Sequence, residues 1–332
     1  MTNAPAFSEI GIVGAGAYGA ALAIAAARAG RNVRLWARDP QAVAAMRERS
    51  EAPRLPGLAL GEAIRPTGDL AELSVCDALI VAVPTQNLRE ACLAMAASLP
   101  RRAPVISAAK GIERASGLFA TEIIARSWPG VETAILSGPS FAEDIGRGLP
   151  TAVTLAATVP GLAQRLAESL SSAAFRIYHA RDVRGVEIGG AAKNVLAIAA
   201  GIAIGLGFGE SARAALVARG FAELRRFGEA HGAEPETLMG LSGLGDVMLT
   251  CASAQSRNFA YGLALGQGRT PAEAAGGKLA EGAFTAPILA EMARSRDIEM
   301  PIATAVAAII AGETGVREAV AGLLARPIRA EI

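Results

Sequence analysis

Lysine is scarce in this 332-residue chain: of its 32 basic residues only three, Lys110, Lys193 and Lys278, are lysine, and the rest are arginine. A lysine side chain that is removed from water can lose its proton near neutral pH, whereas an arginine side chain cannot. Each lysine is therefore a candidate for proton-transfer chemistry.

Cysteine and histidine are also rare. The three cysteines (Cys76, Cys92 and Cys251) are widely spaced and form no CxxC pair, which argues against a disulfide framework and a zinc site. We therefore predict three small core residues and no metal. The two histidines, His179 and His231, lie in no recognisable catalytic setting, so we expect the proton donor of any catalysed reaction not to be histidine.

The charges nearly balance. The 32 basic and 31 acidic residues give a net charge of +1, which is too small to attract nucleic acid or an anionic membrane by electrostatics. The N-terminus, MTNAPAFSEI, has no basic segment followed by an apolar one, and the longest uncharged apolar run, residues 195–208, is too short to span a bilayer. We predict a cytoplasmic protein without nucleic-acid partners or membrane insertion.

The first half of the chain alternates short apolar runs with helical segments, as in a parallel sheet covered by helices. We expect helices at residues 20–29 and 88–98, and strands at residues 9–16, 32–38, 77–84, 104–110 and 133–138, with 151–157 and 175–180 as later additions. Beyond about Arg181 the pattern is helical. We predict two domains, residues 1–183 and 184–332.

A glycine-rich turn follows the first expected strand. Gly14-x-Gly16-x-x-Gly19 has the spacing at which the first glycine allows a tight turn, the second allows a pyrophosphate to approach the backbone, and the third allows a helix to pack on the strand. We interpret residues 1–183 as a Rossmann-like dinucleotide-binding domain, joined to an all-helical substrate domain. The alternative is a glycine-rich turn without a ligand.

The end of the second expected strand reads Arg38-Asp39. An acidic residue here binds a free ribose 2′-hydroxyl, whereas an arginine accommodates a 2′-phosphate. Because Arg38 precedes Asp39 at the end of this strand, the sequence favours NADPH, with NADH as the alternative.

Lys193 lies at the head of an apolar segment that contains no other charge, GGAAKNVLAIAAGIAIGLGF. Partial desolvation there would lower its pKa toward the range of a general acid or base. The alternative is that its ammonium reaches solvent beside the helix end. Asp246 follows Gly240, Gly243 and Gly245, which we expect to form a flexible approach; it is a candidate site residue, or alternatively a helix cap.

Two further regions carry polar groups suited to an anion. Ser256-Arg257-Asn258 precedes an expected helix, and an arginine, an amide and helix-terminal N–H groups together can bind a phosphate. Lys110 directly follows an expected strand, and Ser140 follows another and is expected to start a helix. Both should lie at the carboxyl end of the sheet, where ligands bind in open α/β folds.

Taken together, the pieces GAGAYGAALA, VAVPTQ, SAAKGIE, SGPSFAEDI, GVEIGGAAKNVLAIAAGI, GLGDVMLTCASAQSRN and EGAFTA resemble, in order and spacing, the bacterial NAD(P)-dependent glycerol-3-phosphate dehydrogenases, from about Ile10 to beyond Ala286. The resemblance implies reversible reduction of dihydroxyacetone phosphate to sn-glycerol 3-phosphate, a precursor of phospholipids.

The resemblance also implies roles for individual residues. Lys193 matches the general acid/base of the family, with Asp246 beside it orienting Lys193 and the substrate hydroxyl. The positions that match substrate contacts are Lys110, Gly138, Ser140, Lys193, Asp246, Ser256, Arg257 and Asn258. Those that match cofactor contacts are Gly14, Gly16, Ala17, Tyr18, Gly19, Arg38, Lys110, Ala142, Arg257, Leu279 and Glu281. Lys278 is given no role.

The chain departs from the family at one place: Ala17 and Tyr18 stand where the family commonly has serine followed by tryptophan or phenylalanine. One hydroxyl contact to the pyrophosphate is therefore missing. Two effects on the pKa of Lys193 oppose each other: desolvation would lower it, whereas a carboxylate nearby would raise it.

Two other functions stay open at this point: a dehydrogenase of 2-keto or 2-hydroxy acids resembling ketopantoate reductase, and a non-catalytic NAD(P)-binding sensor. The alanine-rich C-terminal helices suggest a homodimer.

Overall fold

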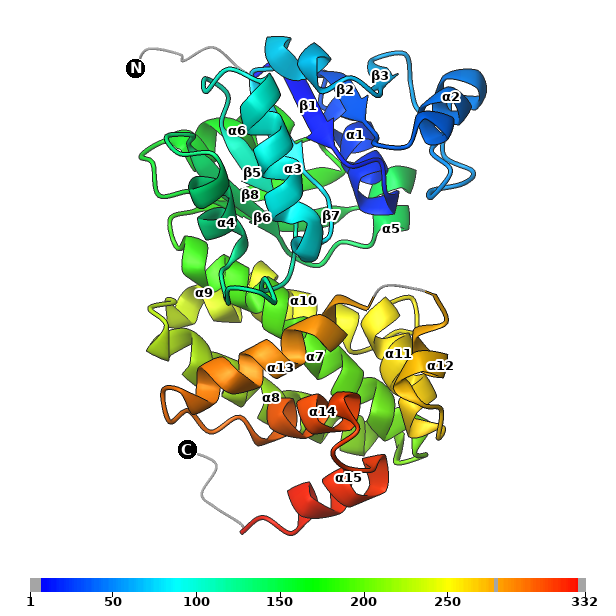
Figure 1. Cartoon of the computed structure of the whole chain (residues 1–332), viewed down its shortest axis with the longest axis vertical. Coiled ribbons are helices and arrows are strands. Elements are labelled where there is room, and N and C mark those ends of the chain that lie inside the picture. The colour runs from blue at the N-terminus through cyan, green and yellow to red at the C-terminus, as the bar shows by residue number, and fades with distance from the viewer. Residues whose placement is uncertain (1–6, 278–279, 328–332) are drawn as a thin grey trace. The chain divides into compact units, whose positions relative to one another are not determined.

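The computed structural model describes residues 7–277 and 280–327, which form two compact units (Figure 1). The sheet unit comprises Met1–Glu113 and Leu118–Glu187, and the helical unit comprises Arg114–Gly117 and Ile188–Ile332. The division after Glu187 falls inside helix α7 (Val183–Gly205), close to the boundary expected at residues 183 and 184. The Rossmann-like domain followed by a helical domain is confirmed.

The sheet unit contains eight strands in the order β3-β2-β1-β4-β5-β6-β7-β8. The strands are β1 Glu9–Val13, β2 Asn32–Trp36, β3 Ile64–Thr67, β4 Ala78–Val81, β5 Val105–Ser107, β6 Thr133–Ser137, β7 Thr151–Ala156 and β8 Phe175–Ala180. Neighbours from β3 to β6 are parallel, but β7 is antiparallel to β6 and parallel to β8. The expected parallel sheet is therefore present from β3 to β6, and the sequence did not reveal the antiparallel strand β7, which begins at the end of the sheet where β6 finishes.

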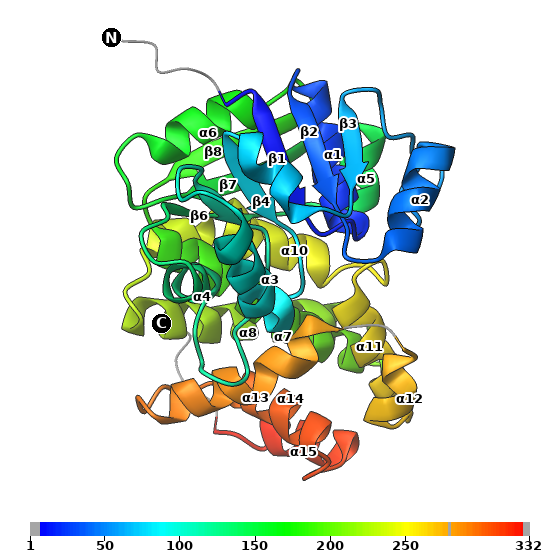
Figure 2. The same cartoon turned by 45° about the horizontal axis from the view of Figure 1, so that its top comes forward.

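Strand β3 was not predicted. It reads IRPT, and Pro66 argues against a central strand because proline donates no ladder hydrogen bond. The structure places β3 at the edge of the sheet, next to helix α2 (Pro40–Arg49), where proline is tolerated (Figure 2).

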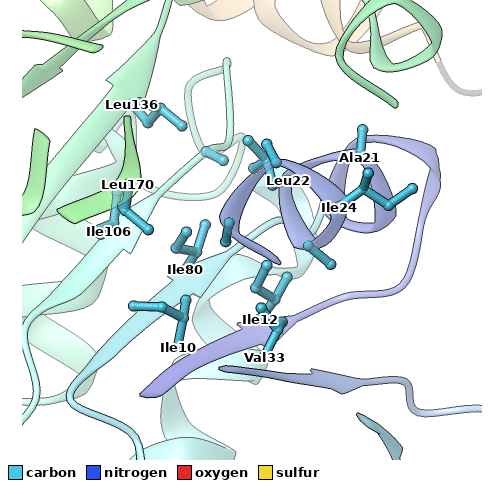
Figure 3. Packing of buried hydrophobic residues seen from close by; sticks show 14 of the residues in the cluster. Ile10, Ile12, Ala21, Leu22, Ile24, Val33, Ile80, Ile106, Leu136 and Leu170 are labelled. Carbon is cyan, nitrogen blue, oxygen red and sulfur yellow. The ribbon is translucent and has the colours of Figure 1, made fainter. Parts of the chain in front are cut away.

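Helices cover both faces of the sheet because successive strand side chains alternate between them. On one face, Ile10 and Ile12 of β1 pack with α1 (Ala17–Arg28) and α6 (Leu162–Leu170), and Figure 3 shows the isoleucines of neighbouring strands beside Leu22 of α1. On the other face, Val13 packs with α3 (Thr85–Ser98) and α4 (Ala120–Ser127). Two apolar layers thus hold β1 in place, and with it the glycine turn.

The helical unit is built around α7. The other helices are α8 Gly209–Ala230, α9 Pro235–Met239, α10 Asp246–Thr250, α11 Arg257–Gly266, α12 Pro271–Ala275, α13 Glu281–Arg294, α14 Pro301–Ala311 and α15 Val316–Leu324.

Close packing explains the small residues of the apolar segment. A Cβ atom at Gly201 would lie 2.2 Å from the carbonyl oxygen of Phe259, and one at Gly262 would lie 2.0 Å from that of Ile198, so α7 and α11 approach backbone to backbone. By length and composition α7 could cross a membrane, but 89% of its most apolar 18-residue window is buried, as in a core helix.

Candidate active site

The glycine turn has the geometry of an anion-binding site. Gly14 has φ +112°, which favours glycine, and a Cβ atom at Gly19 would lie 1.9 Å from the carbonyl oxygen of Gly14. Gly16 is the N-cap of α1, makes no side-chain cap, and has open space where a Cβ atom would be. No side chain caps the first turn of α1, so its N–H groups and the positive end of its dipole are of the kind that can bind an anion. Ala17 and Tyr18 are the first residues of this helix.

Arg38 and Asp39, the second and third residues after β2, have different environments. Asp39 is the N-cap of α2, and its Oδ1 accepts a hydrogen bond from the N–H of Gln41 at 2.9 Å. The Arg38 side chain is 76% exposed, and its Nη1 lies 3.7 Å from Oε1 of Glu90. The carboxylate is thus engaged in capping, whereas the guanidinium is exposed and its pair with Glu90 is long.

The loops after β5 and β6 meet in a polar network. The Nζ atom of Lys110 and the Oγ atom of Ser140 both donate to the carbonyl oxygen of Gly138, at 2.9 and 2.8 Å. The Tyr18 hydroxyl lies 2.9 Å from Oγ of Ser140. The sequence therefore grouped Lys110, Gly138 and Ser140 correctly in space, but it did not reveal their contact with Tyr18.

The expectation that Ser140 starts a helix is wrong by two residues. Helix α5 (Ala142–Arg147) begins at Ala142, with Phe141 as its N-cap, because the Ser140 hydroxyl bonds back to Gly138.

Lys193 and Asp246 form a buried ion pair in the helical unit. The Nζ atom of Lys193 lies 2.5 Å from Oδ1 of Asp246, and the two residues are 6% and 1% exposed. The alternative of an ammonium that reaches solvent is therefore wrong. Asp246 is also not a cap, since Gly245 is the N-cap of α10 and the Asp246 carboxylate contacts the lysine.

Thr250 completes this cluster and was not predicted. Its Oγ1 accepts a hydrogen bond from Nζ of Lys193 at 3.1 Å and donates to Oδ1 of Asp246 at 3.2 Å. Thr250 lies four residues after Asp246, the spacing that puts two side chains on one helix face. That spacing is the signal that could have identified it.

The glycines before Asp246 form a compact turn. Residues Leu241–Gly245 make one π-helical turn, and a Cβ atom at Gly243 would lie 1.9 Å from the carbonyl oxygen of Leu238. The expected flexible approach is therefore wrong: this glycine allows close packing and so helps fix the start of α10. Single π-helical turns are frequent at functional sites.

The three residues Ser256, Arg257 and Asn258 have separate roles within the unit. The Ser256 side chain caps α11, which starts at Arg257 and therefore earlier than expected. The Asn258 amide donates to Oδ1 of Asn194 at 2.8 Å and accepts from the N–H of Gly282 at 2.9 Å. Arg257 is the exposed member of the three.

The remaining predicted residues lie at helix starts or outside the described segments. Ala142 and Glu281 are the first residues of α5 and α13, and Glu281 is half-buried. Leu279 and Lys278 lie outside the described residues.

Glu187, six residues before Lys193, binds within the sheet unit. Its Oε1 accepts hydrogen bonds from the N–H and the hydroxyl of Thr121, both at 2.8 Å. Burial raises the pKa of the Glu187 carboxyl to about 7 despite these bonds. The carboxylate fastens the first turn of α7 to the start of α4.

The three cysteines are buried and free, as predicted. Burial raises the pKa of the Cys251 thiol to about 12, so it is not a reactive thiolate at neutral pH. Within residues 7–277 and 280–327, no group of three or more His, Cys, Asp or Glu residues could hold a metal ion.

Family models match both halves of the chain. The model described as NAD-dependent glycerol-3-phosphate dehydrogenase N-terminus matches residues 9–163, and the model for the C-terminus matches residues 182–321.

Individual proteins show the same similarity over nearly the whole chain. The glycerol-3-phosphate dehydrogenases (NAD(P)+) of Azorhizobium caulinodans and Methylobacterium radiotolerans are each 57% identical, with 98% of this chain covered and 99% and 98% of theirs. The crystal structure of glycerol-3-phosphate dehydrogenase from Coxiella burnetii is 37% identical, with a TM-score of 0.92, over 97% of this chain and 100% of that one. A ketopantoate reductase from Ralstonia eutropha, 20% identical with a TM-score of 0.61 over 94% of this chain and 99% of its own, shares the fold.

Proposed function

The chain belongs to the NAD-dependent glycerol-3-phosphate dehydrogenase family, and on that basis we propose that it catalyses the reversible reduction of dihydroxyacetone phosphate to sn-glycerol 3-phosphate. The observation that carries the proposal is the buried Lys193–Asp246 pair, since a carbonyl reduction needs a proton donor and the two histidines are not suited to that role. Lys193 is that donor.

The groups at the glycine turn fit a nicotinamide dinucleotide. The first turn of α1 offers backbone N–H groups, and Gly16 leaves space for the pyrophosphate. The bound dinucleotide supplies the hydride. We propose NADPH as the preferred form, because Arg38 is exposed whereas the Asp39 carboxylate caps α2.

Lys193 donates a proton from Nζ to the carbonyl oxygen of the substrate. Burial of the side chain favours the neutral amine, and the adjacent Asp246 carboxylate favours the ammonium, so the pair keeps a proton on Nζ until an oxygen with developing negative charge accepts it. Hydrogen bonds with Asp246 and Thr250 orient Nζ. In the reverse direction the same nitrogen accepts the proton of the substrate hydroxyl.

Arg257 binds the phosphate of the substrate. It is exposed at the first residue of α11, where its guanidinium and the N–H groups of the helix start can bind a dianion together. The capping by Ser256 and the bonds of Asn258 fix this helix start, so both residues support the phosphate site through the backbone as well as by any direct contact. We propose Lys110, Gly138 and Ser140 as the substrate contacts from the sheet unit.

The function is tested by following NADPH absorbance with purified protein and dihydroxyacetone phosphate, beside a parallel assay with 2-keto acids such as ketopantoate. We expect oxidation that requires the phosphorylated substrate. Oxidation only with a 2-keto acid would assign the chain to the other dehydrogenase class that shares the fold. Binding of NADPH without oxidation by either substrate would indicate a sensor.

The cellular setting is part of the proposal. The free buried cysteines and the balanced charge support a cytoplasmic enzyme that feeds glycerophospholipid synthesis without membrane insertion. The homodimer stays a prediction, which analytical ultracentrifugation would test.

A further inference from the structure

We propose that Tyr18 is a positioning residue that couples dinucleotide binding to substrate binding through its hydroxyl group. The inference rests on the proposed function and concerns a contact within the sheet unit. Tyr18 is the second residue of α1, the helix whose start offers N–H groups to the pyrophosphate, yet its side chain contacts the loop after β6. One residue therefore belongs to the dinucleotide turn by its backbone and to the substrate loop by its side chain.

The direction of the hydrogen bonds follows from counting protons. The Ser140 hydroxyl has one hydrogen, which it donates to the carbonyl oxygen of Gly138 at 2.8 Å. The contact of 2.9 Å between Tyr18 and Ser140 must then have the tyrosine as donor. The chain of donors runs from Tyr18 to Ser140 and on to Gly138, so the tyrosine hydroxyl fixes the rotamer of the serine.

The carbonyl oxygen of Gly138, which accepts the last of these hydrogen bonds, also accepts one from Lys110 and belongs to a constrained peptide. Gly138 has φ +144°, and a Cβ atom there would lie 2.9 Å from Cα of Val153, so the peptide is held in a conformation that favours glycine. Its carbonyl oxygen also accepts from Nζ of Lys110 at 2.9 Å. The same Nζ lies 5.6 Å from the centre of the Tyr18 ring, within the range of a cation–π contact. Tyr18 therefore acts on the proposed substrate lysine both through Gly138 and directly.

The side chains of Tyr18, Ser140 and Lys110 are already linked through the carbonyl oxygen of Gly138. A dinucleotide bound at the first turn of α1 would stabilise this arrangement. Substrate binding would then meet residues that are already in place, and by reciprocity bound substrate would strengthen dinucleotide binding by the same factor. Removal of the hydroxyl should weaken this linkage more than it weakens binding of either ligand alone.

The test uses Tyr18→Phe, which keeps the ring and the backbone N–H. The Kd of NADPH is measured by fluorescence with and without glycerol 3-phosphate, a pair that cannot react because both members are reduced. In the wild type we expect glycerol 3-phosphate to lower the Kd of NADPH about fivefold or more. In Tyr18→Phe we expect the ratio of the NADPH Kd values without and with glycerol 3-phosphate to fall toward one. The Kd of NADPH alone should change less than about twofold. The KM for dihydroxyacetone phosphate should rise about three- to tenfold, the effect of one lost hydrogen bond. The matched control is Tyr178→Phe, on the exposed face of β8.

A double-mutant cycle tests whether Tyr18 and Ser140 act on substrate binding through their shared hydrogen bond. The effects of Tyr18→Phe and Ser140→Ala on KM should be strongly non-additive, because either change breaks the same chain of hydrogen bonds. Additive effects, an unchanged linkage factor in Tyr18→Phe, or a wild-type factor of one would overturn the coupling. Wild-type turnover of dihydroxyacetone phosphate in the same preparations separates these outcomes from a failure of the proposed function.

Discussion

The Nζ atom of Lys193 lies 2.5 Å from Oδ1 of Asp246, and both residues are almost completely buried. They lie 53 residues apart in the sequence and are brought together by α7 and the start of α10. A lone ammonium buried to this extent would be costly, so the carboxylate stabilises the charged form of Lys193. In the proposed mechanism, proton transfer therefore depends on Asp246 as well as on the lysine.

The charge of the Asp246 carboxylate should control both the rate of reduction and its pH dependence. Asp246→Asn keeps the shape of the side chain but removes the charge, which destabilises the ammonium form of Lys193. We expect kcat for reduction to fall about 100-fold or more. We also expect the residual activity to be lost at a lower pH than in the wild type as the pH is raised. Steady-state rates between pH 6 and 10 would measure both. Asp297→Asn, at an exposed turn, is the control, and an unchanged pH profile would contradict the proposed charge pairing.

Arg257→Ala should mainly raise the KM for dihydroxyacetone phosphate. If the guanidinium binds the phosphate as proposed, it does so equally in the ground state and in the transition state, so its removal weakens binding with a smaller effect on kcat. A loss of about 2 kcal/mol, typical of a charge-assisted hydrogen bond, corresponds to a roughly 30-fold rise. Arg269→Ala, an exposed arginine just after α11, should leave KM unchanged. If the two variants behave alike, the phosphate binds elsewhere.

Arg38→Ala tests the cofactor preference. If the guanidinium pairs with the 2′-phosphate, its removal should lower kcat/KM for NADPH about tenfold or more, with little change for NADH. Arg49→Ala, at the other end of α2, is the matched control. Equal losses with both dinucleotides would mean that Arg38 contacts a part of the cofactor that NADH shares.

The ionisation of Glu223 should make the free energy of unfolding depend on pH. Its buried carboxylate accepts hydrogen bonds from the N–H groups of Ile302 and Ala303 at the start of α14, with Arg226 and Arg326 nearby. Burial nevertheless raises its pKa from 4.5 to about 7. Between these values the folded protein binds more protons at this group than the unfolded chain, so the stability that Glu223 contributes decreases as the pH rises through about 7.

The variant Glu223→Gln retains an acceptor oxygen but cannot ionise. Its unfolding free energy relative to the wild type should therefore increase from pH 5 to pH 8, by up to about 3 kcal/mol at 1.36 kcal/mol per pKa unit. Urea denaturation at a series of pH values measures the difference. Glu229→Gln, exposed on the same helix, controls for loss of a surface charge. A difference that stays constant with pH would show that Glu223 ionises normally.

Much of the site could be predicted because its signals are local. The spacing of Gly14, Gly16 and Gly19 identified the turn, and the rarity of lysine together with its apolar surroundings pointed to Lys193. The apolar neighbours of Lys193 left two alternatives open, burial or an ammonium that reaches solvent, and the structure shows burial.

The remaining features depend on contacts between distant segments. The alternation of residues in β7 shows which side chains lie on the same face of the sheet, but it does not show the direction of the strand. The antiparallel pairing of β7 with β6 could therefore not be predicted from the sequence. The amide of Asn258 binds Asn194, 64 residues away, and the hydroxyl of Tyr18 binds Ser140, 122 residues away. Neither pairing has a signature in the local sequence.

Proton donation by Lys193 is tested most directly by measuring NADPH oxidation by Lys193→Ala with saturating dihydroxyacetone phosphate. We expect kcat to fall by a factor of about 100 to 10,000, the usual contribution of a general acid, while the Kd of NADPH stays within about twofold of the wild type. An alanine variant that retains most of the wild-type kcat would contradict the account.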